Sequence, residues 1–231
     1  MQSSYTLYRA DCRDFIAENK GKFPPNTMVI SDPPYNIGFG YNTFKDNMSE
    51  EAYIKMLGAL ASLRAAIILY PRETMRYLVP ALGAPDDVMI WCYASNLPRQ
   101  ARLINIYNTV ADRTAVRQPY RNLSDKRIQA RIEAGSKGAR MYDWFTDINL
   151  VKNVSQEKGI HPCPVPVALM ERIILMTTQP GDTVFDPFMG GGTTGIAALN
   201  TGRNFIGCEL DGMYFKYAEE RLAAHLTQAV P

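Results

Sequence analysis

The chain has 231 residues with a formal net charge of +2, and its content of 46% hydrophobic and 21% charged residues is typical of one soluble domain, or one domain with a large insertion. No apolar run approaches the roughly 18 residues that span a bilayer, and the N-terminus lacks a signal-peptide core, so we expect a cytoplasmic protein without a membrane segment. The four cysteines show no Cys-x-x-Cys spacing, which argues against a disulfide framework and against a metal site.

Basic residues gather in the middle of the chain. Between Ser95 and Arg140 the sequence holds ten basic and three acidic residues, so this segment is positive while the remainder is negative. Such a block is typical of a segment that binds a polyanion, although a solvated helical face has the same composition. We therefore treat residues 95–150 as a candidate nucleic-acid-binding insert.

In chain order, the sequence predicts a strand at 28–30, a Gly- and Asn-rich loop at 36–47, and a helix from Ser49 as N-cap to about residue 63. A strand at 66–70, a helix at 73–82 and a strand at 88–93 precede the insert, in which 124–132 predicts a short Arg-rich helix. The pattern resumes with a helix at 167–178, a strand at 183–186, a helix at 193–201, a strand at 204–209 and a helix at 213–225. This alternation predicts an α/β fold with a Rossmann-like, doubly wound, mostly parallel sheet, formed by residues 1–94 and 151–231.

A glycine-rich turn, Asp186-Pro-Phe-Met-Gly-Gly-Gly-Thr-Thr, follows the strand predicted at 183–186. Glycines there let the backbone approach a ligand closely, but no lysine follows them as in a P-loop, and Asp186 would repel a pyrophosphate. Glu209, at the end of the next predicted strand, has the position of an acidic residue that binds a ribose diol. A ligand with a ribose and a positive end but no phosphate fits both carboxylates, and S-adenosylmethionine has that description.

The turn Asp32-Pro33-Pro34-Tyr35 follows the strand predicted at 28–30 and suits the chemistry of an exocyclic amine on a nucleobase. The amine lone pair is delocalised into the ring, so two acceptors that grip its N–H groups would favour a pyramidal, nucleophilic nitrogen. Asp32 offers a carboxylate, Pro33 a carbonyl of restricted direction, and Tyr35 a flat face for a flipped base. One stack returns roughly 1–3 kcal/mol against the few kcal/mol needed to extrude a base. A rigid turn with Asp32 as a cap would explain the tetrapeptide alone.

Together these segments resemble the β-class, or permuted, amino-methyltransferases of DNA, in which Asp-Pro-Pro-Tyr precedes Phe-Asp-Pro-Phe-x-Gly-x-Gly as it does here. The resemblance covers nearly the whole chain. It implies a class I methyltransferase fold, S-adenosylmethionine as cofactor, DNA as partner, and a role in DNA methylation or restriction-modification in a bacterial or phage-infected cell; it also allows for a homodimer. Asp-Pro-Pro-Tyr is usual in adenine-N6 enzymes, so we expect a site-specific DNA adenine methyltransferase.

The resemblance also assigns residues to the site. The catalytic turn is Asp32, Pro33, Pro34 and Tyr35. Cofactor contacts are expected from Asp11, Cys12, Asp32, His161, Pro162, Asp186, Phe188, Gly190, Gly192, Thr193, Thr194, Glu209 and Leu210. The insert has the position of the family's target-recognition region, and its expected DNA contacts are Arg99, Arg102, Arg117, Arg121, Lys126, Arg127 and Arg131. Cys163, Pro164 and Val165 stand where Thr, Gln and Lys are usual, so any polar contacts made by those side chains near the methionine part of the cofactor are lost.

Three other functions fit parts of this pattern. The same machinery could methylate cytosine N4 or an RNA amine, and identification of the modified nucleoside separates these products. A catalytically silent nucleic-acid-binding homologue would retain the fold, and the altered residues 163–165 favour it; such a protein would not bind S-adenosylmethionine. A Rossmann dehydrogenase is disfavoured by Asp186 in the turn and by the missing Gly-x-Gly-x-x-Gly fingerprint.

Overall fold

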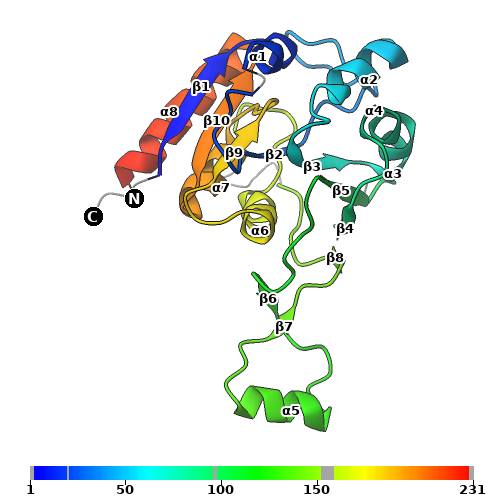
Figure 1. Ribbon diagram of the computed structural model, residues 1–231, viewed down its shortest axis with the longest axis vertical. Helices are drawn as coiled ribbons and strands as arrows, with labels where there is room; N and C mark the ends of the chain where they lie inside the picture. The colour runs from blue at the N-terminus through cyan, green and yellow to red at the C-terminus, as the bar shows by residue number, and fades with distance from the viewer. Residues whose placement is uncertain (1–2, 20, 96–97, 152–158, 229–231) are drawn as a thin grey trace.

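The computed structural model describes residues 3–19, 21–95, 98–151 and 159–228, and its centre is an eight-stranded sheet (Figure 1). The strand order is β1-β10-β9-β2-β3-β5-β4-β8, and all neighbours are parallel except β5, which runs antiparallel to β3 and β4. The strands are β1 (Tyr5–Arg9), β2 (Met28–Ser31), β3 (Arg64–Leu69), β4 (Asp87–Cys92), β5 (Ala101–Tyr107), β8 (Trp144–Phe145), β9 (Thr183–Asp186) and β10 (Asn204–Glu209).

Helices cover both faces of the sheet, and each face has its own apolar core. One core involves α6 (Val167–Thr177), α7 (Thr193–Asn200) and α8 (Gly212–Gln228). The other involves α1 (Cys12–Asn19), α2 (Glu50–Gly58) and the segment α3 (Pro71–Glu73), η1 (Thr74–Leu78) and α4 (Val79–Leu82). Along β2, Met28 and Ile30 belong to the first core and Val29 to the second. Burial on both faces is the reason why such strands are continuous apolar runs.

The connections reverse direction between β9 and β2, which are paired in parallel through Met28 with Val184 and Val29 with Phe185. From β9 the chain continues through α7 to β10 on one side, whereas from β2 it continues through α2 to β3 on the other. A crevice opens at the carboxyl ends of the strands at such a switch point, and it is where open α/β sheets bind ligands. The two motifs of the sequence follow these two strands.

Most of the predicted elements are confirmed. The strands at 183–186 and 204–209 have the predicted bounds, and α6 and α7 end one residue earlier than predicted. The predicted helix after Ser49 ends at Gly58 instead of about residue 63, although Ser49 is its N-cap as expected. The predicted helix at 73–82 contains a π-turn over Thr74–Leu78 directly before Pro80, which lacks the N–H that a regular helical turn would need.

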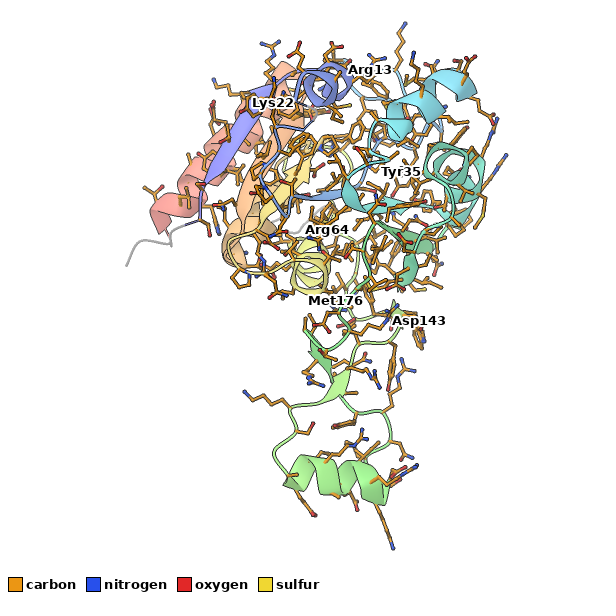
Figure 2. All side chains as sticks on the ribbon, viewed as in Figure 1. Arg13, Lys22, Tyr35, Arg64, Asp143 and Met176 are labelled. Atoms are coloured by element: carbon orange, nitrogen blue, oxygen red, sulfur yellow. The ribbon has the colours of Figure 1, made fainter. Side chains whose placement is uncertain are left out.

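The segment predicted as the insert, residues 95–150, includes two strands of the sheet, β5 and β8. Residues 101–107 form β5 between β3 and β4 inside the sheet, because their apolar side chains are buried in the core. The part that leaves the sheet is an arm with two short paired strands, β6 (Arg117–Gln118) and β7 (Ala139–Arg140), and α5 (Lys126–Glu133) at its tip (Figure 1). The arm returns at Asp143, which lies beside the sheet (Figure 2) and whose carbonyl accepts a hydrogen bond from the N–H of Ile90 at 2.7 Å.

Two ion pairs fix the base of the arm to the domain. Arg113 donates two hydrogen bonds of 2.8 Å to Asp87 on β4. Arg172 on α6 donates two, of 2.7 and 2.6 Å, to Asp147. No residue of α5 is buried, so this helix at the tip of the arm is stabilised locally. The side chain of Asp125 caps the N-terminus of α5 by accepting a hydrogen bond from the N–H of Arg127.

Candidate active site

A buried hydrogen bond joins the carboxyl ends of β2 and β9. Ser31, the last residue of β2, donates its hydroxyl to Oδ1 of Asp186, the last residue of β9, at 2.5 Å. Asp186 also accepts from the Thr194 hydroxyl at 2.6 Å and from the N–H of Phe188 at 3.0 Å. Burial raises the pKa of Asp186 to about 6, and the nearby charge of Asp32 adds to the rise, while the three donors oppose it.

The glycine turn after β9 is shaped by close contacts that a side chain would disrupt. Gly190 has a φ of +49°, and a Cβ there would lie 3.1 Å from the ring of His161. Glu209, at the end of β10, accepts from the N–H of Gly190 at 2.9 Å and from the N–H of Asp211 at 2.8 Å. Burial raises the pKa of Glu209. The turn therefore presents bare backbone and two partly desolvated carboxylates at one edge of the sheet.

Two hollows open at this edge. The first, about 750 Å³ with its open mouth, lies between the start of α1, the loop 36–47 and the end of β10. The second, about 450 Å³, lies against the glycine turn and α8. Both are lined by Asp32, His161, Phe188 and Gly190. The Asp-Pro-Pro-Tyr turn and the glycine turn thus border two adjacent hollows with shared walls, which together are called the cleft.

The structure brings most of the predicted cofactor residues together at this cleft. The first hollow is lined by Asp11, Cys12, Glu209 and Leu210, the second by Asp186, Thr193 and Thr194, and both by Asp32, His161, Phe188 and Gly190. Pro162 and Gly192 line neither hollow. Gly192 instead supports the turn from behind: its φ is +77°, and a Cβ there would lie 3.1 Å from that of Ala218.

Asp32 is held by two donors from different parts of the chain. Its Oδ1 accepts from the hydroxyl of Tyr35, and its Oδ2 lies 3.2 Å from Nη1 of Arg102 on β5. Burial raises the pKa of Asp32, and the Arg102 charge opposes this rise.

The other residues of the turn are less open than the sequence suggests. The ring of Tyr35 lies inside the domain (Figure 2), is 7% exposed and meets Tyr70 edge-on at 5.0 Å between centroids. The Pro34 carbonyl accepts from the Tyr53 hydroxyl, and Pro33 is buried and lines neither hollow.

The predicted DNA-contacting residues divide into two groups. Those on the arm are exposed: Arg117, Arg121, Lys126, Arg127 and Arg131. Arg121 lies 4.4 and 4.3 Å from the ring centroids of Tyr142 and Trp144, and Arg127 pairs with Asp125 at 3.0 Å.

Two of the predicted DNA contacts belong to the domain instead. The side chain of Arg99 is 42% exposed and pairs with the buried Glu73 at 3.1 Å. The assignment of Arg102 to the DNA-binding surface is wrong, because β5 carries its side chain inward to Asp32.

Several site residues had escaped the sequence analysis. Arg221 of α8 lines the second hollow and donates to the Gly191 carbonyl at 2.9 Å and to the Thr193 hydroxyl at 3.2 Å. Ser31, the last residue of β2, was given no role by the sequence. The signal for Arg221 was a basic residue on the inner face of an amphipathic helix, which is a common pattern without functional meaning by itself.

The loop 36–47 also forms part of the cleft. Tyr41, Thr43 and Phe44 line the first hollow, and the Thr43 hydroxyl donates to Asp211 at 2.5 Å. The buried Asp46 organises the loop by accepting from the N–H groups of residues 36, 37 and 39. Among the described residues, no three His, Cys, Asp or Glu side chains are grouped to hold a metal ion, and no helix is long and apolar enough to cross a membrane.

Comparison with known proteins places these features in context. The type II methyltransferase M2.DpnII of Streptococcus pneumoniae is 46% identical over 87 residues. These residues are 38% of this chain and 32% of that protein. The DNA adenine methyltransferase YhdJ of Escherichia coli is 28% identical over 239 residues, which cover 90% of this chain and 80% of that protein. The crystal structure of the M1.HpyAVI–SAM complex superposes with a TM-score of 0.64 at 24% identity, covering 94% of this chain and 98% of that one.

The chain has the class I methyltransferase fold, with a doubly wound sheet, an antiparallel β5 and a cleft at the switch point. The family model described as DNA methylase matches residues 76–220, more than half of the chain. The chain therefore belongs to the DNA methylase family.

Proposed function

We propose that the protein is a DNA adenine-N6 methyltransferase that transfers a methyl group from S-adenosylmethionine to a flipped-out adenine. The observation that carries this proposal is the hydrogen bond of 2.5 Å between Ser31 and Asp186, because it places the two strand-end motifs beside one cleft. Family membership supports methylation of DNA, and the name of YhdJ, which aligns over 90% of this chain, supports adenine over cytosine.

The residues of the cleft fit S-adenosylmethionine. A positively charged ligand suits the buried Asp186, and a ribose diol suits Glu209 in the first hollow. Gly190 borders both hollows with bare backbone, and a Cβ there would press on the ring of His161, which lines the same hollows. Arg221 offers a cation for the carboxylate end, which compensates for the absence of a lysine at Val165. The cofactor supplies a methyl group activated by its sulfonium.

On the side of the base, Asp32 would accept hydrogen bonds from the adenine amine and direct the nitrogen lone pair at the methyl group. The reaction is a direct in-line transfer: the nitrogen–carbon bond forms as the sulfur–carbon bond breaks, and the nitrogen releases one proton, for which Asp32 is the adjacent acceptor. The Pro33 carbonyl as second acceptor and Tyr35 as stacking ring remain predictions. Stacking on Tyr35 requires one face of its ring to open, since the ring is 7% exposed and Tyr70 meets it edge-on at 5.0 Å.

DNA would be attracted by the arm, whose exposed basic residues suit phosphate contacts that give affinity and salt dependence. The loop 36–47 is a candidate guide for the flipped base, because Tyr41, Thr43 and Phe44 stand at the mouth of the first hollow. A homodimer and a cytoplasmic location remain predictions, and sedimentation of the purified protein measures the first.

The test is to incubate the protein with unmethylated DNA and labelled S-adenosylmethionine, digest the product and identify the modified nucleoside. We expect N6-methyl-2′-deoxyadenosine. N4-methyl-2′-deoxycytidine would replace the adenine assignment, and DNA without a modified nucleoside would overturn the proposed activity. Asp32→Ala is expected to abolish turnover while cofactor binding, measured by calorimetric titration, is largely retained. A near-normal rate in that variant would contradict the role of Asp32.

A further inference from the structure

An arginine lies buried next to the carboxylate that the proposed reaction uses. Arg102 is on β5, in the middle of the sheet, and its side chain is only 13% exposed, while that of Asp32 is 15% exposed. Its Nη1 lies 3.2 Å from Asp32 Oδ2, and its Nε donates to the Tyr93 hydroxyl at 3.3 Å. The guanidinium is therefore fixed from two sides by polar groups.

Four aromatic rings enclose the same guanidinium. Its Cζ lies 5.5 Å from the ring centroid of Tyr35, 5.3 Å from Tyr70, 5.4 Å from Trp91 and 5.8 Å from Tyr93. Rings at this distance attract a cation through their electron-rich faces and compensate in part for the loss of water. A buried ion pair is nevertheless weak evidence of stability, because desolvation can exceed the attraction of the two charges. The enclosure is better explained by what the cation does to Asp32.

A neighbouring cation favours the ionised form of Asp32 in this environment. The groups that act on Asp32 are the phenols of Tyr35 and Tyr41 from the segment after β2, the phenol of Tyr53 on α2, the guanidinium of Arg102 on β5 and the carboxylate of Asp186 on β9. The phenols are neutral at physiological pH, and Asp186 repels a second negative charge. Burial and Asp186 thus favour the protonated acid, whereas Arg102 favours the carboxylate.

The geometry also leaves room for the target amine. Each carboxylate oxygen has about two lone-pair directions. The Tyr35 hydroxyl uses one direction on Oδ1, and Arg102 uses one on Oδ2. One direction therefore remains on each oxygen, and neither partner needs to leave when an N–H group arrives.

We propose that Arg102 is a positioning residue, which keeps Asp32 ionised and turns its free lone pairs toward the adenine amine. This role rests on the proposed function. Arg102 acts through Asp32 and transfers no proton itself. Its loss would raise the pKa of Asp32 further, and a protonated carboxyl group loses acceptor capacity for the amine.

The experiment compares four variants by single-turnover methylation of DNA as a function of pH. Arg102→Met and Arg102→Gln remove the charge, and Gln retains a hydrogen-bond donor; Arg102→Lys retains the charge. An adjacent arginine lowers the pKa of an aspartate by about 1–3 units, so we expect the acidic limb of the rate profile to move to higher pH by about that amount in Arg102→Met and Arg102→Gln, and by less in Arg102→Lys.

Arg99→Met is the matched control, because Arg99 also stacks on Tyr70, at 5.0 Å, but pairs with Glu73 instead of Asp32. Its midpoint is expected to stay at the wild-type pH.

A second measurement does not depend on activity. In protein labelled with ¹³C at the aspartate carboxyl, the Asp32 resonance is identified by its loss in Asp32→Asn, and its titration midpoint is expected to rise in Arg102→Met and Arg102→Gln. Unshifted midpoints in both experiments, with a uniform loss of rate, would overturn the proposal and leave Arg102 a packing residue. A shifted Asp32 titration in a protein that methylates no adenine would instead overturn the proposed function while the effect of Arg102 on Asp32 stands. If Arg102→Met fails to fold, Arg102→Gln and Arg102→Lys still compare an uncharged with a charged side chain at this position.

Discussion

The glycine turn after β9 and the Asp-Pro-Pro-Tyr turn after β2 lie side by side, yet they are held in different ways. Apart from Ser31, the partners of Asp186 are its sequence neighbours Phe188 and Thr194. The Asp32 turn is held by Tyr53, Arg102 and the rings around it, which come from several other elements. A site formed by sequence neighbours is recognisable as a motif. In a site assembled from distant elements, the sequence reveals the motif but not the partners that the fold brings to it.

The largest effect is expected at Asp186, the carboxylate with which the glycine-rich segment begins. Asp186→Asn should weaken binding of S-adenosylmethionine at least about 30-fold, because losing one partner of a buried charge pair costs ~2–5 kcal/mol. Calorimetric titration measures this loss. Unchanged affinity would show that Asp186 does not contribute to binding of S-adenosylmethionine.

A folding control accompanies this variant. The pKa of Asp186 in the folded protein, about 6, lies above that of an unfolded aspartate, so the folded protein binds the extra proton and loses stability as pH rises between those two values. Asn at this position should therefore be as stable as wild type at pH 7.5, or more stable by up to about 3 kcal/mol. Thermal unfolding tests this, and a large drop would mean that weak binding reflects misfolding.

Arg221→Met tests the far side of the same turn. We expect affinity for S-adenosylmethionine to fall about tenfold or more, since a hydrogen bond to a charged group is worth ~1.5–3 kcal/mol. The decarboxylated cofactor should bind wild type and variant alike, because it lacks the group that Arg221 would hold. Lys216→Met is the matched control on α8, where Lys216 is exposed and pairs only loosely with Glu220, at 3.8 Å. An equal loss with both ligands would contradict the assignment.

Ser31→Ala removes the link between the two turns. The Ser31 hydroxyl lowers the pKa of Asp186, so its loss should raise that pKa above about 6. Affinity for the cationic ligand falls as pH drops through the pKa of Asp186, and the variant should lose affinity at a higher pH than wild type. Titrations between pH 5 and 8 measure both midpoints. We expect a severalfold effect at neutral pH, and coincident midpoints would show that the hydrogen bond does not tune the carboxylate.

The smallest effect is expected on the arm, which contacts neither turn. Arg131→Ala should lower the slope of log affinity for DNA against log salt concentration by about 0.9, the value of one phosphate contact. Fluorescence anisotropy at several salt concentrations measures the slope. Arg76→Ala is the control, because Arg76 is exposed on the domain and pairs with Glu50. Equal slopes for wild type and Arg131→Ala would remove this residue from the DNA-binding surface.

The same contrast explains how much the sequence could predict. The strands β9 and β10 were found with their bounds because each has a short apolar centre between clear turns. Strand β5 was missed because Arg102 and Asn105 make it look polar, and both find their partners in other elements: Arg102 in Asp32, and Asn105 in the Ile67 carbonyl and the Thr74 hydroxyl, each at 3.1 Å. A count of charges along the chain cannot distinguish an arginine that points to solvent from one that pairs inside a sheet.

Because Asp32, His161, Phe188 and Gly190 border both hollows, the cofactor and the target base would be bound against the same side chains. Two ligands in that arrangement are thermodynamically reciprocal: if the first tightens the second by some factor, the second tightens the first by the same factor. The ternary complex therefore has one free energy whichever ligand arrives first, and a substitution in the shared wall that changes the affinity for one ligand in the presence of the other changes the converse affinity by the same factor.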